Sequence, residues 1–125
     1  MFYKCNICGN FVGLLENGGG ELVCCGEPME NLIEKTQEEG SEKHLPFVEI
    51  EDNKVKIKIG SVDHPMLEEH YIKFIIVKYN DKTYKKELKP NKMPILEFEI
   101  DEFFEKLEVY EYCNIHGLWK TEVKK

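Results

Sequence analysis

The sequence predicts an all-β protein, in which a small metal-clipped module precedes an antiparallel β-sandwich. Three observations lead to this fold class. Cysteines are dense only near the start of the chain, where four of the five lie within the first 25 residues. From Leu45 onward, apolar and polar residues alternate with the period of two that strands require. No segment shows a convincing helical period, so about seven short strands with polar turns are expected.

The composition is that of a chain folded throughout. Of the 125 residues, 42% are hydrophobic and 11% aromatic, which is enough for a compact core. High cysteine density at the start divides the chain into a module over residues 1–36 and a domain over residues 37–125.

The charge and the hydropathy pattern argue against two classes of partner. A formal net charge of -7 disfavours nonspecific nucleic-acid binding, which depends on Lys and Arg neutralising phosphates. No stretch approaches the roughly 18 consecutive apolar residues of a membrane span, and the N-terminus lacks the pattern of an export signal. We therefore expect a cytoplasmic protein whose thiols bind metal and do not form disulfides.

Two cysteine pairs define the first module. Cys5 and Cys8 are three apart and can approach one ion from a tight turn, as in zinc ribbons and iron-thiolate knuckles. Cys24 and Cys25 are adjacent, so in a strand they would point to opposite faces. Binding one ion through both requires a local twist and a distorted tetrahedron. Because about 36 residues bury too little surface to fold unaided, the ion should be part of the module's stability.

The segments between and after the cysteine pairs are short. An apolar strand over residues 11–15 and a glycine turn over 17–20 predict a hairpin with residues 21–23. Residues 34–43 contain no apolar side chain and predict a solvated linker.

The sandwich strands follow in order. Residues 54–59 alternate lysine with valine or isoleucine, which places the aliphatic side chains on one face. Residues 71–79 are nearly continuous in apolar residues and should form a central strand, ended by a hairpin turn at Asn80. Residues 101–106 have room for one helical turn at most. The other predicted strands cover residues 83–88, 95–100, 107–113 and 118–123.

The remaining cysteine and all four histidines form a second candidate site. Cys113 and His116 are three apart at the end of a predicted strand, and a rigid sandwich presents functional groups at such ends. The other histidines also lie at strand ends or in loops: His44, His64 and His70. Four imidazoles and one thiolate exceed the four ligands of structural zinc and suit a five-coordinate ion with one open position. Iron is the natural candidate.

A copper electron-transfer site is the alternative. Such sites on β-sandwiches take two histidines, one cysteine and often an axial methionine shortly after the histidine. No methionine follows Met93 in this chain, which makes copper the weaker interpretation.

These motifs resemble the desulfoferrodoxins, the two-iron superoxide reductases, over nearly the whole chain. Residues 3–9, 18–20 and 22–26 look like the desulforedoxin-type first domain of that family, and residues 42–44, 64–66, 70–72 and 113–119 look like its catalytic domain. Adjacent cysteines followed by this second set make a specific signature.

The resemblance implies two iron ions per chain. The first would be held in a distorted four-cysteine centre by Cys5, Cys8, Cys24 and Cys25. The second would be ringed by His44, His64, His70 and His116, with Cys113 as the axial ligand. The sixth position would be open, or occupied by Glu42 when the iron is ferric.

The same resemblance implies an activity and partners. The reaction is the one-electron reduction of superoxide to hydrogen peroxide in an immunoglobulin-like catalytic domain, within a homodimer that a rubredoxin supplies with electrons. An axial thiolate donates electron density to iron, which favours giving an electron to a dioxygen species. Lys43 would offer a positive charge to the incoming anion.

Two functions from other classes are alternatives. One is a noncatalytic electron carrier whose working centre is the four-cysteine iron. The other is a zinc-stabilised binding module, which the adjacent cysteines and the surplus histidines disfavour. Metal content and absorption spectra discriminate between these functions most directly.

Overall fold

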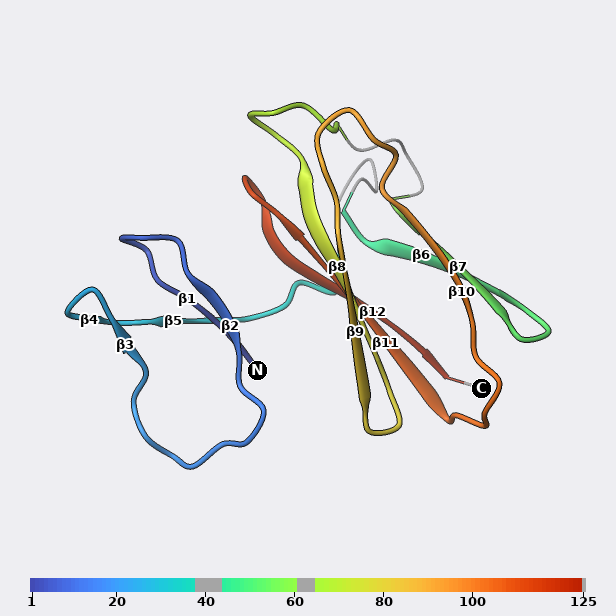
Figure 1. Ribbon diagram of the computed structural model, residues 1–125, viewed down its shortest axis with the longest axis horizontal. Helices are drawn as coiled ribbons and strands as arrows, with labels where there is room; N and C mark the ends of the chain where they lie inside the picture. Colours follow the sequence, from blue (N-terminus) through green and yellow to red (C-terminus); the bar gives the residue numbers. More distant parts are fainter. Residues whose placement is uncertain (38–43, 61–64, 125) are drawn as a thin grey trace. The chain divides into compact units, whose positions relative to one another are not determined.

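The computed structural model describes residues 1–37, 44–60 and 65–124, and within these ranges it contains strands and no helix. The predicted all-β fold class is therefore confirmed. The chain divides into two compact units, Met1–Ile33 and Glu34–Lys125 (Figure 1). Within the described ranges, no helix suited to crossing a membrane is found.

The first unit contains five short strands in two small sheets. A three-stranded antiparallel sheet has the order β2-β1-β5 and consists of β1 (Phe2–Lys4), β2 (Phe11–Gly13) and β5 (Glu30–Leu32). A two-stranded sheet pairs β3 (Val23–Cys24) with β4 (Glu27–Pro28). The loop between β2 and β3 includes the glycine-rich residues 18–20.

The hairpin predicted between residues 11–15 and 21–23 is wrong. β2 pairs with β1, and β3 pairs with β4. A tight turn in which the Gly9 N–H donates to the Cys5 carbonyl at 3.0 Å folds β1 back onto β2. Leu15 is fully exposed and Val23 is 56% exposed, so no apolar contact draws these two segments together.

The second unit is a sandwich of two antiparallel sheets. The three-stranded sheet has the order β10-β7-β6 and the four-stranded sheet has the order β12-β11-β8-β9. Their bounds are β6 (Pro46–Glu51), β7 (Lys54–Ile59), β8 (Ile72–Tyr79), β9 (Lys82–Glu87), β10 (Ile95–Glu99), β11 (Lys106–Cys113) and β12 (Gly117–Lys124). The seven strands agree with the predicted number, and six of them lie close to the predicted ranges; no range was predicted for β6.

Alternating side chains of the two sheets form the core of the sandwich. On β7, Val55, Ile57 and Ile59 are buried, while the lysines between them are exposed or half-buried. On β11, Leu107 and Val109 belong to the same core. Burying each aliphatic side chain of this size contributes about 1.5–3 kcal/mol, so the core can hold the strand ends in place.

Two connections position the ends of the long strands. The turn predicted after residue 79 is confirmed, because Tyr79 pairs with Lys82 and Asn80 has a positive φ of 53°. Residues 101–106 do not form the single helical turn that the sequence allowed. Phe104 is buried in the core, and this contact holds the segment in an irregular conformation before β11 begins.

Candidate metal centres

The four cysteines of the first unit form one cluster. The sulfur atoms of Cys5, Cys8, Cys24 and Cys25 all lie within 4.8 Å of one another. The first pair comes from the turn between β1 and β2, and the second pair from the end of β3 and the turn that follows it. Cys5 is buried, while Cys8 and Cys25 are exposed.

Backbone amides surround the buried sulfur of this cluster. The N–H groups of Ile7 and Cys8 both donate to Cys5 Sγ at 3.4 Å. Hydrogen bonds from these Cys8 and Ile7 amides lower the pKa of the Cys5 thiol to about 6. Hydrogen bonds with Cys8 and Cys5 raise the pKa of Cys25 to about 12. The turn thus stabilises a thiolate at Cys5, the form that binds a metal.

The twist required by the adjacent cysteines is present. Cys25 has a φ of 54° and Gly26 a φ of 77°, so the chain turns sharply at the second cysteine and both sulfurs face the cluster. The sulfurs of Cys8 and Cys24 are 3.6 Å apart, and those of Cys24 and Cys25 are 4.0 Å apart. A tetrahedral ion bonded to sulfurs at about 2.3 Å requires separations of about 3.8 Å. The donor set and its spacing therefore fit a metal ion bound by four thiolates.

The second cluster lies at one end of the sandwich. One ligand atom each from His44, His70 and Cys113 lies within 4.8 Å of the others. Cys113 ends β11, His70 immediately precedes the Tyr71 that leads into β8, and His44 lies just before β6. Cys113 and His44 are buried and His70 is half-buried. Metal–nitrogen and metal–sulfur bonds of about 2.0–2.3 Å let such a group converge on one ion.

His116 belongs to the same end of the sandwich. Its ring centroid is 4.6 Å from that of His44 and 5.0 Å from that of His70, both in tilted, edge-on arrangements. The structure thus brings together three of the four predicted histidines and the predicted cysteine. His116 is exposed, so one side of this group faces solvent. His64, Glu42 and Lys43 lie outside the described residues.

Burial controls the charge of the Cys113 sulfur. Desolvation raises the pKa of the Cys113 thiol. Hydrogen bonds from the backbone N–H groups of His116 and Ile115 to the sulfur lower this pKa, but the effect of desolvation is larger. An ion bound here would displace the thiol proton, because the thiolate is the metal ligand.

Asn114 is a site residue that the sequence pattern did not single out. Its side-chain Oδ1 accepts from the Tyr71 N–H at 3.0 Å, and its Nδ2 donates to the Glu69 carbonyl at 3.0 Å. Its backbone N–H donates to the Tyr71 carbonyl at 3.2 Å. Asn114 thereby joins the turn that carries His70 to the strand end that carries Cys113. The sequence offered only its position directly after the cysteine as a signal.

Two further residues at this site were given no role from the sequence, although Trp119 ends the segment 113–119 that carries the resemblance. The Trp119 ring stacks on His44, with centroids 4.8 Å apart and planes at 13°. Glu111 is fully buried on β11, where it continues the inward-facing series of Leu107 and Val109 toward Cys113. A carboxylate on the apolar face of an alternating strand is a signal that the sequence does contain, because it breaks the period-two pattern.

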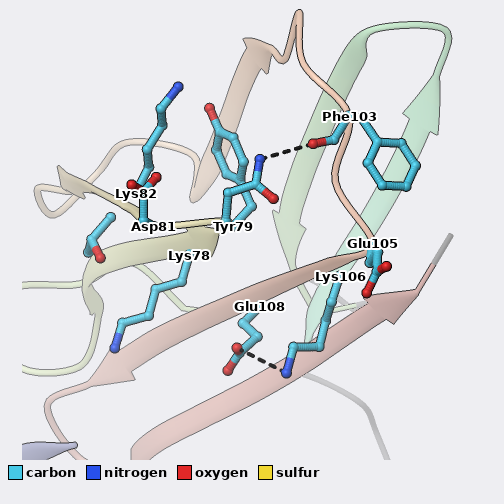
Figure 2. A pocket seen from close by; sticks show the side chains of 10 residues that line it. Lys78, Tyr79, Asp81, Lys82, Phe103, Glu105, Lys106 and Glu108 are labelled. Atoms are coloured by element: carbon cyan, nitrogen blue, oxygen red, sulfur yellow. Dashed lines mark hydrogen bonds and ion pairs between the residues drawn. The ribbon is translucent and has the colours of Figure 1, made fainter.

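A separate pocket lies at the opposite end of the sandwich strands (Figure 2). Its volume is about 570 Å³. At the rise per residue of a strand, the pocket and the histidine cluster are separated by about 20 Å along β8 and β11. Its charged side chains are balanced: Lys78, Lys82, Lys106, Asp81, Glu105 and Glu108. Because the three lysines are matched by three carboxylates, the pocket has no net charge with which to select an ion. Lys106 and Glu108 also form an ion pair at 3.4 Å.

Comparisons with known proteins agree over both units. The family model for the desulfoferrodoxin N-terminal domain matches residues 1–32, and the model for desulfoferrodoxin matches residues 36–122. A desulfoferrodoxin homolog from Archaeoglobus fulgidus is 48% identical over 95% of this chain and 94% of its own length. Desulfoferrodoxin from Nitratidesulfovibrio vulgaris is 48% identical over 96% of this chain and 94% of its own length. The superoxide reductase structure from Treponema pallidum matches with a TM-score of 0.75 at 33% identity, covering 96% of this chain and 94% of that one.

Proposed function

Because this chain belongs to the desulfoferrodoxin family, we propose that it is a superoxide reductase, which reduces superoxide by one electron to hydrogen peroxide. The observation that carries the proposal is the convergence of His44, His70 and Cys113 at one end of the sandwich. The match to a superoxide reductase structure over both units supports it.

Two metal sites fit the residues of this chain. A four-cysteine iron would be held in the first unit by Cys5, Cys8, Cys24 and Cys25. A second iron would be held by Cys113 and the histidines near it, with His64 as the fourth imidazole that the family resemblance implies. An iron ion bound by imidazoles and one thiolate would supply a one-electron reductant, because the thiolate donates electron density to it.

The protein's own residues prepare this site in three ways. The sandwich core buries Cys113, so its sulfur is kept from solvent. The turn after β11 leaves His116 exposed, which gives a small anion access from solvent. Asn114 fixes the spacing between the Cys113 and His70 segments by three hydrogen bonds. Ligands held in this way need little rearrangement during the reaction.

The roles of Glu42 and Lys43 are part of the proposal. Lys43 attracts superoxide toward the site in a protein whose net charge of -7 repels anions. Glu42 would serve as a further ligand when the bound iron is ferric. Substitution of Glu42 by Ala should change the ferric absorption spectrum and leave the first reaction with superoxide nearly unchanged. An identical ferric spectrum would exclude Glu42 as a ligand.

The partners follow from the family resemblance. The electron donor is a rubredoxin, the assembly is a homodimer and the location is the cytoplasm. Reoxidation of reduced rubredoxin by the ferric protein tests the donor, and light scattering of the purified protein tests the dimer.

Metal analysis with absorption spectra in both oxidation states tests the proposed function. Two irons per chain, and a thiolate-to-iron band that disappears in Cys113→Ser, would support the enzyme. One zinc per chain and no colour would exclude it. Iron confined to the four-cysteine site would favour a noncatalytic electron carrier instead.

A further inference from the structure

The segment that begins the second unit lies against the edge of the sheet that carries the histidine cluster. Lys35 and Trp119 form a parallel bridge. The Lys35 N–H donates to the Leu118 carbonyl at 2.9 Å, and the Lys120 N–H donates to the Lys35 carbonyl at 2.9 Å. β12 is an edge strand, so this short bridge covers part of its open side. The backbone of Lys35 is thereby fixed beside the turn between β11 and β12.

The Lys35 side chain contacts that turn directly. Its Nζ donates to the His116 carbonyl at 2.9 Å and lies 5.0 Å from the centroid of the Trp119 ring. The Trp119 Nε1–H donates to the same carbonyl at 3.2 Å. Both donors therefore converge on the backbone of His116, and the Trp119 ring at the same time packs against His44.

Two side chains of the turn, those of Ile115 and His116, lie toward solvent, while Asn114 is held by its hydrogen bonds to Tyr71 and Glu69. Ile115 is 59% exposed and His116 is exposed, so neither side chain is anchored in the core. Gly117 has a φ of 86°, a conformation that glycine adopts without strain. A Cβ atom at Gly117 would lie 4.0 Å from Lys35 Nζ. The ammonium group thus lies beside Gly117, the residue at which the turn enters β12.

We propose that Lys35 is a positioning residue of the histidine–cysteine site, which together with Trp119 clamps the His116 carbonyl and so fixes the turn that joins Cys113 to His116. The proposal rests on the proposed function, because the turn matters only if it carries metal ligands. A hydrogen bond from a charged donor is stronger than one between neutral groups, and the cation over the indole ring adds to it.

The first experiment tests the clamp without any metal. Trp119 is the only tryptophan, so fluorescence excited beyond the absorption of the six tyrosines reports on this ring beside the turn. In the metal-free protein, Lys35→Met should shift the emission to longer wavelength and increase acrylamide quenching about two- to five-fold, because the ammonium group no longer holds the His116 carbonyl beside the indole ring. Lys35→Arg, which keeps the donor and the charge, should restore both values. Lys92→Met removes the same charge from an exposed loop and should match the wild type.

The second experiment tests the link to the metal site. The rate at which a chelator removes the iron that gives the thiolate-to-iron band should rise about two- to five-fold in Lys35→Met, which corresponds to the free energy of one exposed charge-assisted hydrogen bond. The reduction potential of that iron should also fall, because a nearby cation favours the ferrous state. Lys35→Arg should keep the wild-type release rate and potential.

The outcomes separate the two proposals. Unchanged quenching in Lys35→Met, or an Arg variant that behaves like the Met variant, would overturn the clamp. Altered fluorescence with unchanged iron release and potential would overturn the positioning role. A wild-type protein without the thiolate-to-iron band would contradict the proposed function, while the fluorescence experiment would still decide whether the clamp exists.

Discussion

Asn114 shows how a single side chain can set the geometry of a metal site. Substitution by Ala would remove the acceptor for the Tyr71 N–H and the donor to the Glu69 carbonyl. Since each lost hydrogen bond at a partly buried site costs about 0.5–1.5 kcal/mol, Asn114→Ala should lower the free energy of unfolding by about 1–3 kcal/mol in denaturant titrations.

A matched variant separates the two contacts of Asn114. Asn114→Asp keeps an oxygen for the Tyr71 N–H but places its second oxygen against the Glu69 carbonyl, so it should be at least as destabilised as Asn114→Ala. Equal stability of all three proteins would show that the side chain does not join the two turns.

Lys43 is predicted to act on the rate of encounter. Lys43→Ala should slow the second-order reaction with superoxide, and the decrease should be larger at low ionic strength, where charges are screened least. Rapid mixing at several salt concentrations measures both effects. Lys92→Ala is the control for net charge and should react like the wild type. An equal rate for Lys43→Ala at all salt concentrations would remove the steering role.

The residues that gather at the candidate metal site could be predicted from the sequence, and the residues that contact them from distant segments could not. A cysteine and a histidine three residues apart at a strand end are typical of metal sites, so Cys113 and His116 could be identified from their residue types and separation. Lys35 and Trp119 act through contacts between segments 84 residues apart, and such contacts depend on strand pairing that no local pattern encodes. Glu111 did leave a signal, because it interrupts the apolar face of β11.

At the scale of elements, the pairing of β11 with β12 includes a partly buried ion pair. Lys120 Nζ lies 2.9 Å from Glu108, and the Tyr110 hydroxyl donates to the same carboxylate at 2.9 Å. Burial alone would raise the pKa of Glu108, but the hydrogen bonds from Lys120 and Tyr110 outweigh it and lower the pKa to about 2. The pair therefore stabilises the sheet when Glu108 is ionised.

This ion pair predicts a dependence of stability on pH. The folded pKa lies below the ordinary value of 4.5, so the stabilisation is present above about pH 4.5 and is lost as the pH falls toward 2. Glu108→Gln should lower the free energy of unfolding by about 1–2 kcal/mol at pH 7, after allowance for solvent screening, and by much less near pH 2. Glu87→Gln, which removes an exposed partner of Lys85, is the control. A pH-independent effect of Glu108→Gln would contradict the prediction.

The strands of the sandwich were predictable because one face of each strand is buried. The alternation in β7 gives both its range and its inward side, and the apolar run of β8 marks a central strand. The strands of the first unit were placed correctly only in part. They bury little, and their pairing is set by the turns around the cysteines, so the pattern of apolar residues carried no information about partners.

At the scale of the whole molecule, the two units differ in what stabilises them. Of residues 1–33, only Phe2 and Cys5 are buried apolar side chains, whereas the sandwich has a continuous core. We therefore expect metal removal to unfold the first unit and to leave the sandwich folded. Amide NMR spectra should lose dispersion for residues 1–33 in Cys25→Ser and keep it for residues 44–60 and 65–124. Cys113→Ser is the control and should leave the first unit folded; a folded first unit in Cys25→Ser would contradict this view.

The central claim is that superoxide is reduced at the site that contains Cys113. It is tested most directly by the yield of hydrogen peroxide when the reduced protein is mixed with superoxide. The wild type should form one hydrogen peroxide for each superoxide consumed, without release of dioxygen. Cys113→Ser should keep the spectrum of the four-cysteine iron and lose the rapid reaction. Release of dioxygen with half that yield, or a Cys113→Ser variant as fast as the wild type, would contradict the claim.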